Sequence, residues 1–249
     1  MLLLTVRQVS RKVLAVETSE GEGAIVKRVF PTRQLMHFDP FVLLDEFAIE
    51  PPAGFPDHPH GGFEAVTYML EGGFHHTDNL GNDSIVMAGG VQRFTAGKPI
   101  IHSELPGTKG LNRGLQLWVR LPTKLQNLEP TYQQVDSKDI SEQTVNRHHI
   151  RTIVGENSPV KLRTEITYLD VTLQPKRTFI RDISRDLNAF VYVLKGTVKL
   201  GNTIVRKSEA GLLTEGESIE LSAPESARVV VISGKPHGEQ IVLKGSFVY

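Results

Sequence analysis

Short apolar runs separated by turn residues repeat along most of this chain. The runs are rich in β-branched and aromatic side chains, and Gly, Pro, Asn or Asp often bounds them; they cover residues 65–70, 84–87, 115–121, 190–194, 203–206 and 228–232. Such spacing is typical of an all-β sandwich or barrel. Helical periodicity is nearly absent, and we expect at most one helix, over residues 137–144.

The chain also repeats itself. The motif Tyr-Met-Leu-Glu-Gly at 68–72 returns as Tyr-Val-Leu-Lys-Gly at 192–196, an offset of 124 residues. In both copies a Gly-Asn pair follows, at 81–82 and 201–202, and leads into an apolar run. Two matches in the same order predict a duplicated β domain. The boundary falls in the polar stretch 122–148, so we expect two tandem β-sandwich (jelly-roll) barrels, over residues 1–130 and 131–249.

Composition excludes several classes of protein. The 249 residues carry 28 Lys and Arg against 28 Asp and Glu, so the formal net charge is zero, which argues against direct nucleic-acid contact. No stretch approaches the roughly 20 apolar residues of a membrane-spanning helix. The apolar start at residues 1–6 is too short for a secretory signal. We therefore expect a cytoplasmic protein without membrane contact, and a nuclear location stays open.

Histidines and carboxylates carry the candidate chemistry, because the chain has no cysteine. His58 and His60 stand two residues apart, as do His102 and Glu104. Residues i and i+2 point to the same face of a strand, so two neighbouring strands would bring three imidazoles and one carboxylate together. A single His-x-His or His-x-Glu pair more often consists of two residues without a metal role. Pro59 also disfavours regular strand pairing at the His58–His60 pair.

A site of this composition accepts several metals. Nitrogen and oxygen ligands suit iron, manganese, nickel, cobalt, copper and zinc. Four protein ligands leave two positions open on an octahedral ion, for a substrate and O2, whereas they would close a tetrahedral zinc site and make it structural. The open positions favour Fe(II).

Several ordered motifs identify a family. They read Asp-Pro-Phe-Val-Leu-Leu-Asp-Glu-Phe at 39–47, Phe-Pro-Asp-His-Pro-His at 55–60, Gly-Phe-Glu at 62–64, Gly-Lys-Pro-Ile-Ile-His-Ser-Glu at 97–104 and Gly-Leu-Gln-Leu-Trp-Val at 114–119. Together they resemble the pirin family of the cupin superfamily, closely as far as Leu121 and more loosely beyond it. The chain departs from that pattern at Gly61, where Arg is common, and at Arg93-Phe94, where Trp-Met is usual. These departures put substrate preference in doubt.

The resemblance implies a bicupin with one iron, held in the N-terminal barrel by His58, His60, His102 and Glu104. A shift of 124 residues places Asp182 and Ser184 where the first His pair would be, so we expect no metal in the C-terminal barrel.

Two functions follow from the resemblance. One is a quercetin 2,3-dioxygenase-like activity on flavonols or related phenols with O2, in which Glu104 accepts the substrate proton. The alternative is a non-enzymatic, iron- and redox-dependent regulator that acts through protein partners, since family members are described as transcription cofactors. A third reading leaves the metal structural or absent.

The remaining candidates are weighed one by one. Glu64 either orients a ligand imidazole or is an ordinary strand carboxylate. We expect Gln116 to be a satisfied core amide rather than a pocket residue, and Trp118 to be core rather than a substrate platform. His75 and His76 are expected in a loop near the barrel mouth without a metal role, and His148 and His149 in a solvated linker.

Overall fold

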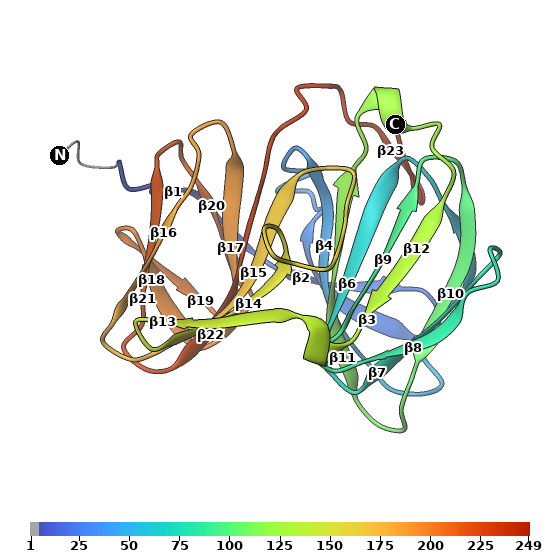
Figure 1. The fold of residues 1–249 in the computed structure, drawn as a ribbon, viewed down its shortest axis with the longest axis horizontal. Coiled ribbons are helices and arrows are strands. Elements are labelled where there is room, and N and C mark those ends of the chain that lie inside the picture. The colour runs from blue at the N-terminus through green and yellow to red at the C-terminus, as the bar shows by residue number, and fades with distance from the viewer. Residues whose placement is uncertain (1–4) are drawn as a thin grey trace. The chain divides into compact units, whose positions relative to one another are not determined.

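The computed structural model describes residues 5–249, so part of the apolar start of the chain lies outside it. Among these residues the regular structure is β-strand apart from two 3-10 turns, η1 (Thr123–Leu125) and η2 (Ser137–Asp139) (Figure 1). The all-β prediction is confirmed. The described residues include no helix long and apolar enough to cross a membrane.

The helix expected over 137–144 is wrong. After one 3-10 turn the chain enters a strand, β13 (Ser141–Val145), in which Thr144 and Val145 pair with the first residues of β14 (His148–Val154). Most side chains of β13 are exposed, because it is an edge strand. A polar, partly β-branched segment of this kind marks an exposed edge rather than a helix.

The strands form two compact units, each assembled from separated segments. The N-terminal sandwich comprises residues 16–140, 159–164 and 237–249, and the C-terminal sandwich comprises 5–15, 141–158 and 165–236. These units differ from the contiguous domains expected over 1–130 and 131–249. The main boundary along the chain lies after residue 140. Residues 5–15 belong to the C-terminal sandwich, and residues 237–249 belong to the N-terminal sandwich.

Two antiparallel sheets build the N-terminal sandwich. The seven-stranded sheet has the order β12-β9-β6-β11-β4-β3-β2, made of Thr131–Val135, Val91–Ala96, Phe63–Glu71, Asn112–Arg120, Phe41–Ile49, Ala24–Phe30 and Val16–Glu20. The four-stranded sheet has the order β5-β10-β7-β8, made of Phe55–His60, Ile100–Pro106, Gly73–Asp78 and Asp83–Met87. A short hairpin, β23-β24, is made of Leu243–Lys244 and Phe247–Val248.

The C-terminal sandwich repeats this plan. Its seven-stranded sheet has the order β1-β20-β17-β22-β15-β14-β13, with β1, β20, β17, β22 and β15 spanning Val9–Leu14, Glu209–Leu213, Asn188–Lys195, Ala227–Gly234 and Ile166–Leu173. Its four-stranded sheet has the order β16-β21-β18-β19, made of Thr178–Asp182, Ser218–Ser222, Thr197–Leu200 and Thr203–Arg206.

The sequence repeat lies at equivalent places in the two units. Each copy of the Tyr-to-Gly motif ends a central strand, β6 or β17, at a glycine with positive φ, Gly72 at 67° and Gly196 at 83°. A hairpin follows in both cases, β7-β8 or β18-β19, and its turn contains the Gly-Asn pair. The matching strand orders show that the prediction of a duplicated β domain is correct.

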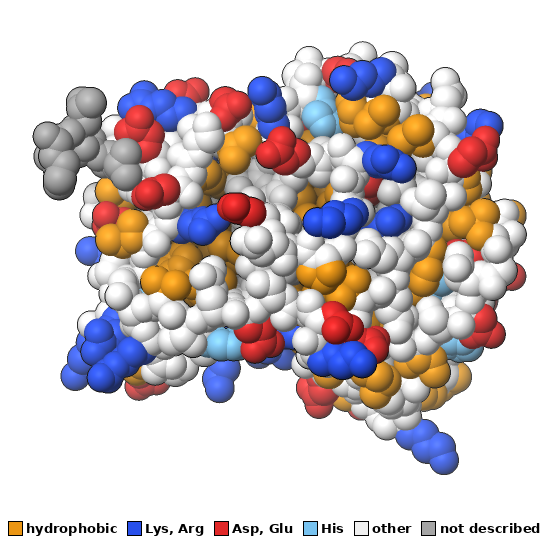
Figure 2. Space-filling view, viewed as in Figure 1, with side chains coloured by type: hydrophobic (Ala, Val, Ile, Leu, Met, Phe, Trp, Pro, Cys, Tyr) orange, Lys and Arg blue, Asp and Glu red, His pale blue; other side chains and the backbone are white. Residues whose placement is uncertain are grey.

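The interiors of the two sandwiches differ in chemistry. In the C-terminal sandwich, Phe179 of β16 and Ile219 and Leu221 of β21 join an apolar cluster fed by both sheets. The equivalent strands of the N-terminal sandwich, β5 and β10, carry histidines instead. On the outside, Lys and Arg side chains alternate with Asp and Glu side chains over the face drawn in Figure 2, in keeping with the balanced composition.

Candidate metal centre

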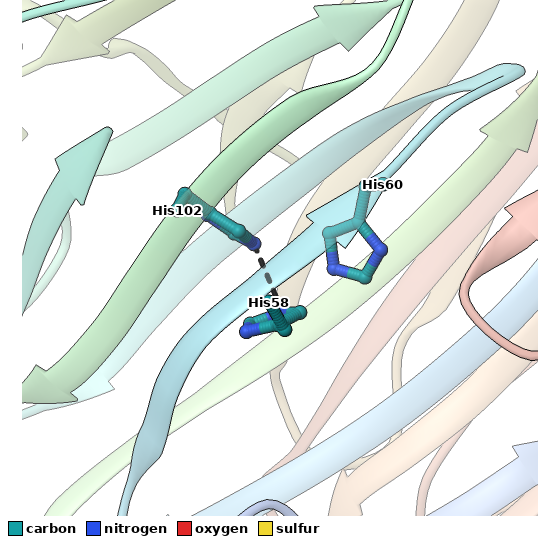
Figure 3. A group of neighbouring side chains, drawn as sticks. All are labelled: His58, His60 and His102. Carbon is teal, nitrogen blue, oxygen red and sulfur yellow. Dashed lines mark hydrogen bonds between the residues drawn. The ribbon is translucent and has the colours of Figure 1, made fainter. Parts of the chain in front are cut away.

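The two His-bearing segments are neighbouring strands of one sheet. β5 and β10 run antiparallel, with His102 opposite His58 and Ile100 opposite His60. Because side chains alternate along a strand, the three imidazoles lie on one face. Ring nitrogens of His58, His60 and His102 all lie within 4.8 Å of one another, and Figure 3 shows the three side chains converging. The expected meeting of distant segments is confirmed for the histidines.

Hydrogen bonds determine which nitrogen of His58 and His60 is free. His58 Nδ1 lies 2.7 Å from the carbonyl oxygen of Pro56, and His60 Nδ1 lies 3.1 Å from that of Ser246. A carbonyl only accepts, so both Nδ1 atoms carry the proton. Burial, followed by the neighbouring His58, lowers the pKa of His60 to about 3, so this ring is neutral at pH 7. Its Nε2 therefore offers a lone pair, and Nε2 is likewise the ring nitrogen that His58 leaves free of this carbonyl bond.

His102 completes the cluster. Its Nε2 lies 3.1 Å from His58 Nε2, along the dashed line in Figure 3. His102 is 1% exposed, and burial together with the neighbouring histidines lowers its pKa well below the ordinary value. Since His58 Nε2 is an acceptor, a proton or a cation has to lie between these two nitrogens. Three convergent imidazole nitrogens are a donor set that first-row metals bind well.

Glu104 is placed differently from the histidines. A register shift in the β5-β10 pairing follows His102, and Glu104 lies opposite His76 of β7. Its carboxylate forms a second group within 4.8 Å with His76 and His102. The extra residue lies in β5, between Phe55 and His58, whereas β10 pairs regularly with β7; Glu104 therefore lies on the same face as His102, which belongs to both groups.

A ring of polar side chains surrounds the Glu104 carboxylate. Oε1 accepts hydrogen bonds from Thr67 Oγ1 at 3.2 Å and Gln92 Nε2 at 2.6 Å, and Oε2 accepts one from Gln116 Nε2 at 3.2 Å. Burial raises the pKa of Glu104 to about 7, although the bonds from Gln92 and Thr67 oppose the shift. Oε2 has fewer protein donors than Oε1, so it is the oxygen with room for a further partner.

A cavity of about 590 Å³ opens onto this cluster. His58, His60 and Glu104 line it together with a predominantly apolar wall that includes Phe47, Phe55, Phe74, Val42 and Trp118. A largely apolar cavity with a few convergent polar groups is the usual form of a small-molecule site.

Comparison with known proteins identifies the family. Residues 23–119 match the family model described as Pirin, and residues 168–249 match the Pirin C-terminal cupin domain. A pirin-like protein from Arabidopsis thaliana is 42% identical, over 97% of this chain and 84% of the relative. The chain belongs to the pirin family.

Solved structures agree with this assignment of the pirin-family fold. A quercetin 2,3-dioxygenase from Acinetobacter baumannii has a TM-score of 0.90 at 27% identity, covering 98% of this chain and 92% of that one. The bacterial pirin YhhW from Escherichia coli, solved in complex with nickel(II), has a TM-score of 0.77 at 22% identity, covering 91% and 99%. Both sandwiches are therefore cupin domains, and the recognition from the sequence is confirmed.

The pirin-family chain places some other candidates where we did not expect them. His75 and His76 lie on β7 rather than in a loop, and His76 is fully buried. His148 is also fully buried on β14 rather than solvated, while His149 beside it is partly exposed. Gln116 lines the cavity, so its amide is not confined to the core. Adjacent residues of a strand point to opposite faces, so one histidine of each pair is buried and the other is more exposed.

The structure shows which contacts Glu64 and Trp118 make. Glu64 is fully buried and accepts hydrogen bonds from Thr95 Oγ1 and from the backbone N–H groups of Arg163 and Thr164. It anchors the segment 159–164, and among the described residues it makes no hydrogen bond to a ligand imidazole. Trp118 stacks on Phe63 and also lines the cavity, so it is both a packing residue and a wall.

Sequence reasoning missed most of the residues that hold the site. Thr67 and Gln92 interrupt the apolar central strands β6 and β9, which is a signal that could have indicated a buried polar network. The segment around Ser246 carries no motif, and only folding brings its carbonyl to His60. Gly61 replaces the usual Arg beside this segment, and a Cβ there would lie 3.0 Å from the ring of Phe247.

Proposed function

We propose that this pirin-family protein is an iron(II)-dependent dioxygenase that cleaves flavonols such as quercetin with O2. His58, His60, His102 and Glu104 would hold the metal, and Glu104 would also accept the substrate proton. The observation that supports this most is the convergence of three imidazole nitrogens, two of them with lone pairs assigned by their hydrogen bonds, beside a large apolar cavity.

The cavity suits a flat, uncharged aromatic substrate. Its aromatic wall offers faces and edges for stacking, and its volume of about 590 Å³ is in the range that encloses a drug-sized molecule. Arg28 is the one Lys or Arg among the described lining residues, and it is paired with Asp45 and Glu20. A substrate carboxylate would therefore meet an already neutralised cation, which favours a phenol over an acid.

Each polar group has a distinct task in this reaction. When bound, the metal lowers the pKa of the substrate hydroxyl and holds substrate and O2 next to each other. Glu104 takes the hydroxyl proton at Oε2, the oxygen with only one protein donor, while Thr67 and Gln92 hold Oε1 in place. The apolar wall excludes water from the reacting carbons. The alternative of a metal-dependent regulator of protein partners shares the same metal centre.

The test is aerobic incubation of the iron-loaded protein with quercetin, followed by loss of the flavonol absorbance and by O2 uptake. Glu104→Gln removes the proton acceptor and keeps the shape, so we expect turnover to fall about 10²–10⁴-fold while iron is retained. Glu71→Gln, an exposed carboxylate at the end of β6, is the matched control and should retain full activity.

Two results would count against the proposal. Wild-type turnover by Glu104→Gln would remove Glu104 as the base. No flavonol loss by the iron-loaded wild type would refute the enzyme, and a partner affinity that depends on the iron oxidation state would then support the regulator.

A further inference from the structure

Two carboxylate–histidine pairs lie on the same hairpin but on opposite faces of its sheet. His75 Nε2 lies 2.7 Å from Asp83 Oδ1 on the outer face, where the Asp83 side chain is 74% exposed. His76 Nε2 lies 3.0 Å from Asp78 Oδ2 inside, where both side chains are 0% exposed. Burying a carboxylate is costly unless it is well hydrogen-bonded, so the inner pair needs a reason that the outer pair does not.

The inner pair continues to the metal centre. His76 Nδ1 lies 3.4 Å from His102 Nδ1, and His102 Nε2 faces His58. The ring of His76 is held flat by Tyr132, which stacks on it with centroids 4.3 Å apart and an angle of 15°. Asp78, His76 and His102 therefore form one line of hydrogen-bonding groups that ends at the candidate metal position.

Proton positions along this line follow from Asp78. Its Oδ1 accepts from the backbone N–H groups of Leu80 and Asn82, its Oδ2 faces His76, and Asn82 Nδ2 donates to both oxygens, at 3.0 Å to Oδ1 and 2.8 Å to Oδ2. Burial alone would raise the pKa of Asp78, but the hydrogen bonds from His76, Asn82 and Leu80 outweigh it and lower the pKa, so the carboxylate stays ionised. An ionised carboxylate only accepts, and His76 therefore carries its proton on Nε2.

The groups from Asp78 through His76 to His102 form a relay of hydrogen bonds, and the proton on His76 Nε2 constrains the position of the next proton along it. A cation held at His102 Nε2 leaves the ring proton of His102 on Nδ1, and His76, which donates from Nε2 to Asp78, accepts that proton at its own Nδ1. His102 Nε2 then presents its lone pair to the same cation as His60 Nε2. We propose that Asp78 and His76 are positioning residues that set the tautomer of His102, so that all three imidazoles present Nε2 to one cation.

This inference builds on the metal centre of the proposed function and assigns residues outside its ligand set. Carboxylate or carbonyl partners commonly orient metal-ligating histidines, and losing one costs about 10–100-fold in metal affinity. His58 and His60 use backbone carbonyls for this purpose. His102 has no such carbonyl among its recorded partners in the described chain, and the Asp78–His76 pair takes that place.

Asp78→Asn tests the relay with almost no change of shape. The two backbone N–H donors on Oδ1 keep the amide oxygen at that position, so the amide NH2 replaces Oδ2 and points at His76. His76 must then accept at Nε2 and carry its proton on Nδ1, which reverses the relay and leaves the proton of His102 on Nε2. Asp83→Asn makes the same substitution in the outer pair and is the matched control.

The direct readout is the tautomer of His102 in the full-length protein saturated with Zn²⁺, from ¹⁵N NMR of the imidazole nitrogens. We expect the Nδ1–H form in the wild type and in Asp83→Asn, and the Nε2–H form in Asp78→Asn. The Nε2–H form in the wild type, or the same tautomer in all three proteins, would overturn the proposal.

Zn²⁺ affinity, measured by competition with a chromophoric chelator, is the second readout. We expect Asp78→Asn to bind Zn²⁺ about 10–100-fold more weakly than the wild type, and Asp83→Asn to match the wild type. His76→Phe keeps the stack on Tyr132 but removes the acceptor, so it should lose affinity similarly. His76→Asn places an amide oxygen near the former Nδ1 and should recover part of the loss.

The outcomes separate this inference from the proposed function. A structural role alone would lower the melting temperature of Asp78→Asn without changing the His102 tautomer, which would refute the relay. Equal Zn²⁺ affinity in all variants would also refute it. A wild type that binds no Zn²⁺ would refute the proposed metal centre, whereas a wild type that binds Zn²⁺ no more tightly than Asp78→Asn would refute this inference alone.

Discussion

We expect the substitution Gly62→Ala, which adds one methyl group, to displace the C-terminal segment from the metal centre. Its φ is +90°, and a Cβ there would lie 1.7 Å from the carbonyl oxygen of Val248. The same segment donates from the Val248 N–H to the Gly61 carbonyl, and the Ser246 carbonyl faces His60 Nδ1. Gly62→Ala must therefore displace residues 246–248, because a backbone oxygen cannot yield as a flexible side chain can.

The expected cost has two parts. A left-handed backbone costs an alanine about 1–2 kcal/mol. Displacing the segment also removes two hydrogen bonds, each worth about 1 kcal/mol, and exposes Val248, which is 1% exposed in the fold and whose burial is worth about 2 kcal/mol. Entropy regained by the released residues offsets part of this loss. We expect the collision with Val248 to lower the free energy of unfolding by about 2 kcal/mol beyond the backbone cost.

Gly81→Ala is the matched control, because Gly81 has the same φ of +90° and no heavy atom within 4 Å of its Cβ position. Urea unfolding followed by fluorescence of Trp118, the single tryptophan, reports on the N-terminal sandwich. Gly62→Ala should be less stable than Gly81→Ala by about 2 kcal/mol, and it should bind Zn²⁺ more weakly because His60 loses its carbonyl. Equal stability of the two variants would refute the assigned contact.

Two further substitutions test buried polar groups. Arg7→Met removes a side chain that is 1% exposed and donates to the backbone carbonyls of Gly216, Leu187 and Ser184 and, at 3.5 Å, of Arg185, so calorimetry should show a loss of about 3 kcal/mol in the free energy of unfolding. Lys207→Met, at an exposed site, should change stability by less than about 0.5 kcal/mol. Glu64→Gln turns an amide NH2 toward the Thr95 hydroxyl or the N–H groups of 163–164 and should cost about 2 kcal/mol in urea unfolding, against little for Glu71→Gln. Unchanged stability of Arg7→Met or Glu64→Gln would contradict the assigned bonds.

Much of the fold could be predicted from local patterns. Short β-branched and aromatic runs bounded by turn residues predicted the strands, because such side chains favour extended backbone, and the repeated motif predicted the duplication because equivalent strands need equivalent turns. The exchange of end segments between the two units could not be predicted. Strand β1 pairs with β20, about 200 residues away in sequence, and no local feature of residues 9–14 specifies that partner.

The candidate site divides in the same way. The spacing of His58, His60 and His102 predicted three imidazoles on one face, because alternation is a property of the strand itself. The same rule placed Glu104 on the face of His102, but its spacing along the strand could not show that its carboxylate groups with His76 and His102 rather than with His58 and His60. His76 was assigned to a loop, although it lies on a buried strand and reaches His102.

The amino-acid sequence by itself therefore determined the family, the β architecture and the side chains available for a metal. Tertiary structure alone decided which nitrogen of each imidazole is free, because that depends on partners such as Pro56, Ser246 and His76. The physical reason is that a hydrogen bond is a property of two groups in space. Residues distant in the chain meet only when the register of each sheet brings them into contact.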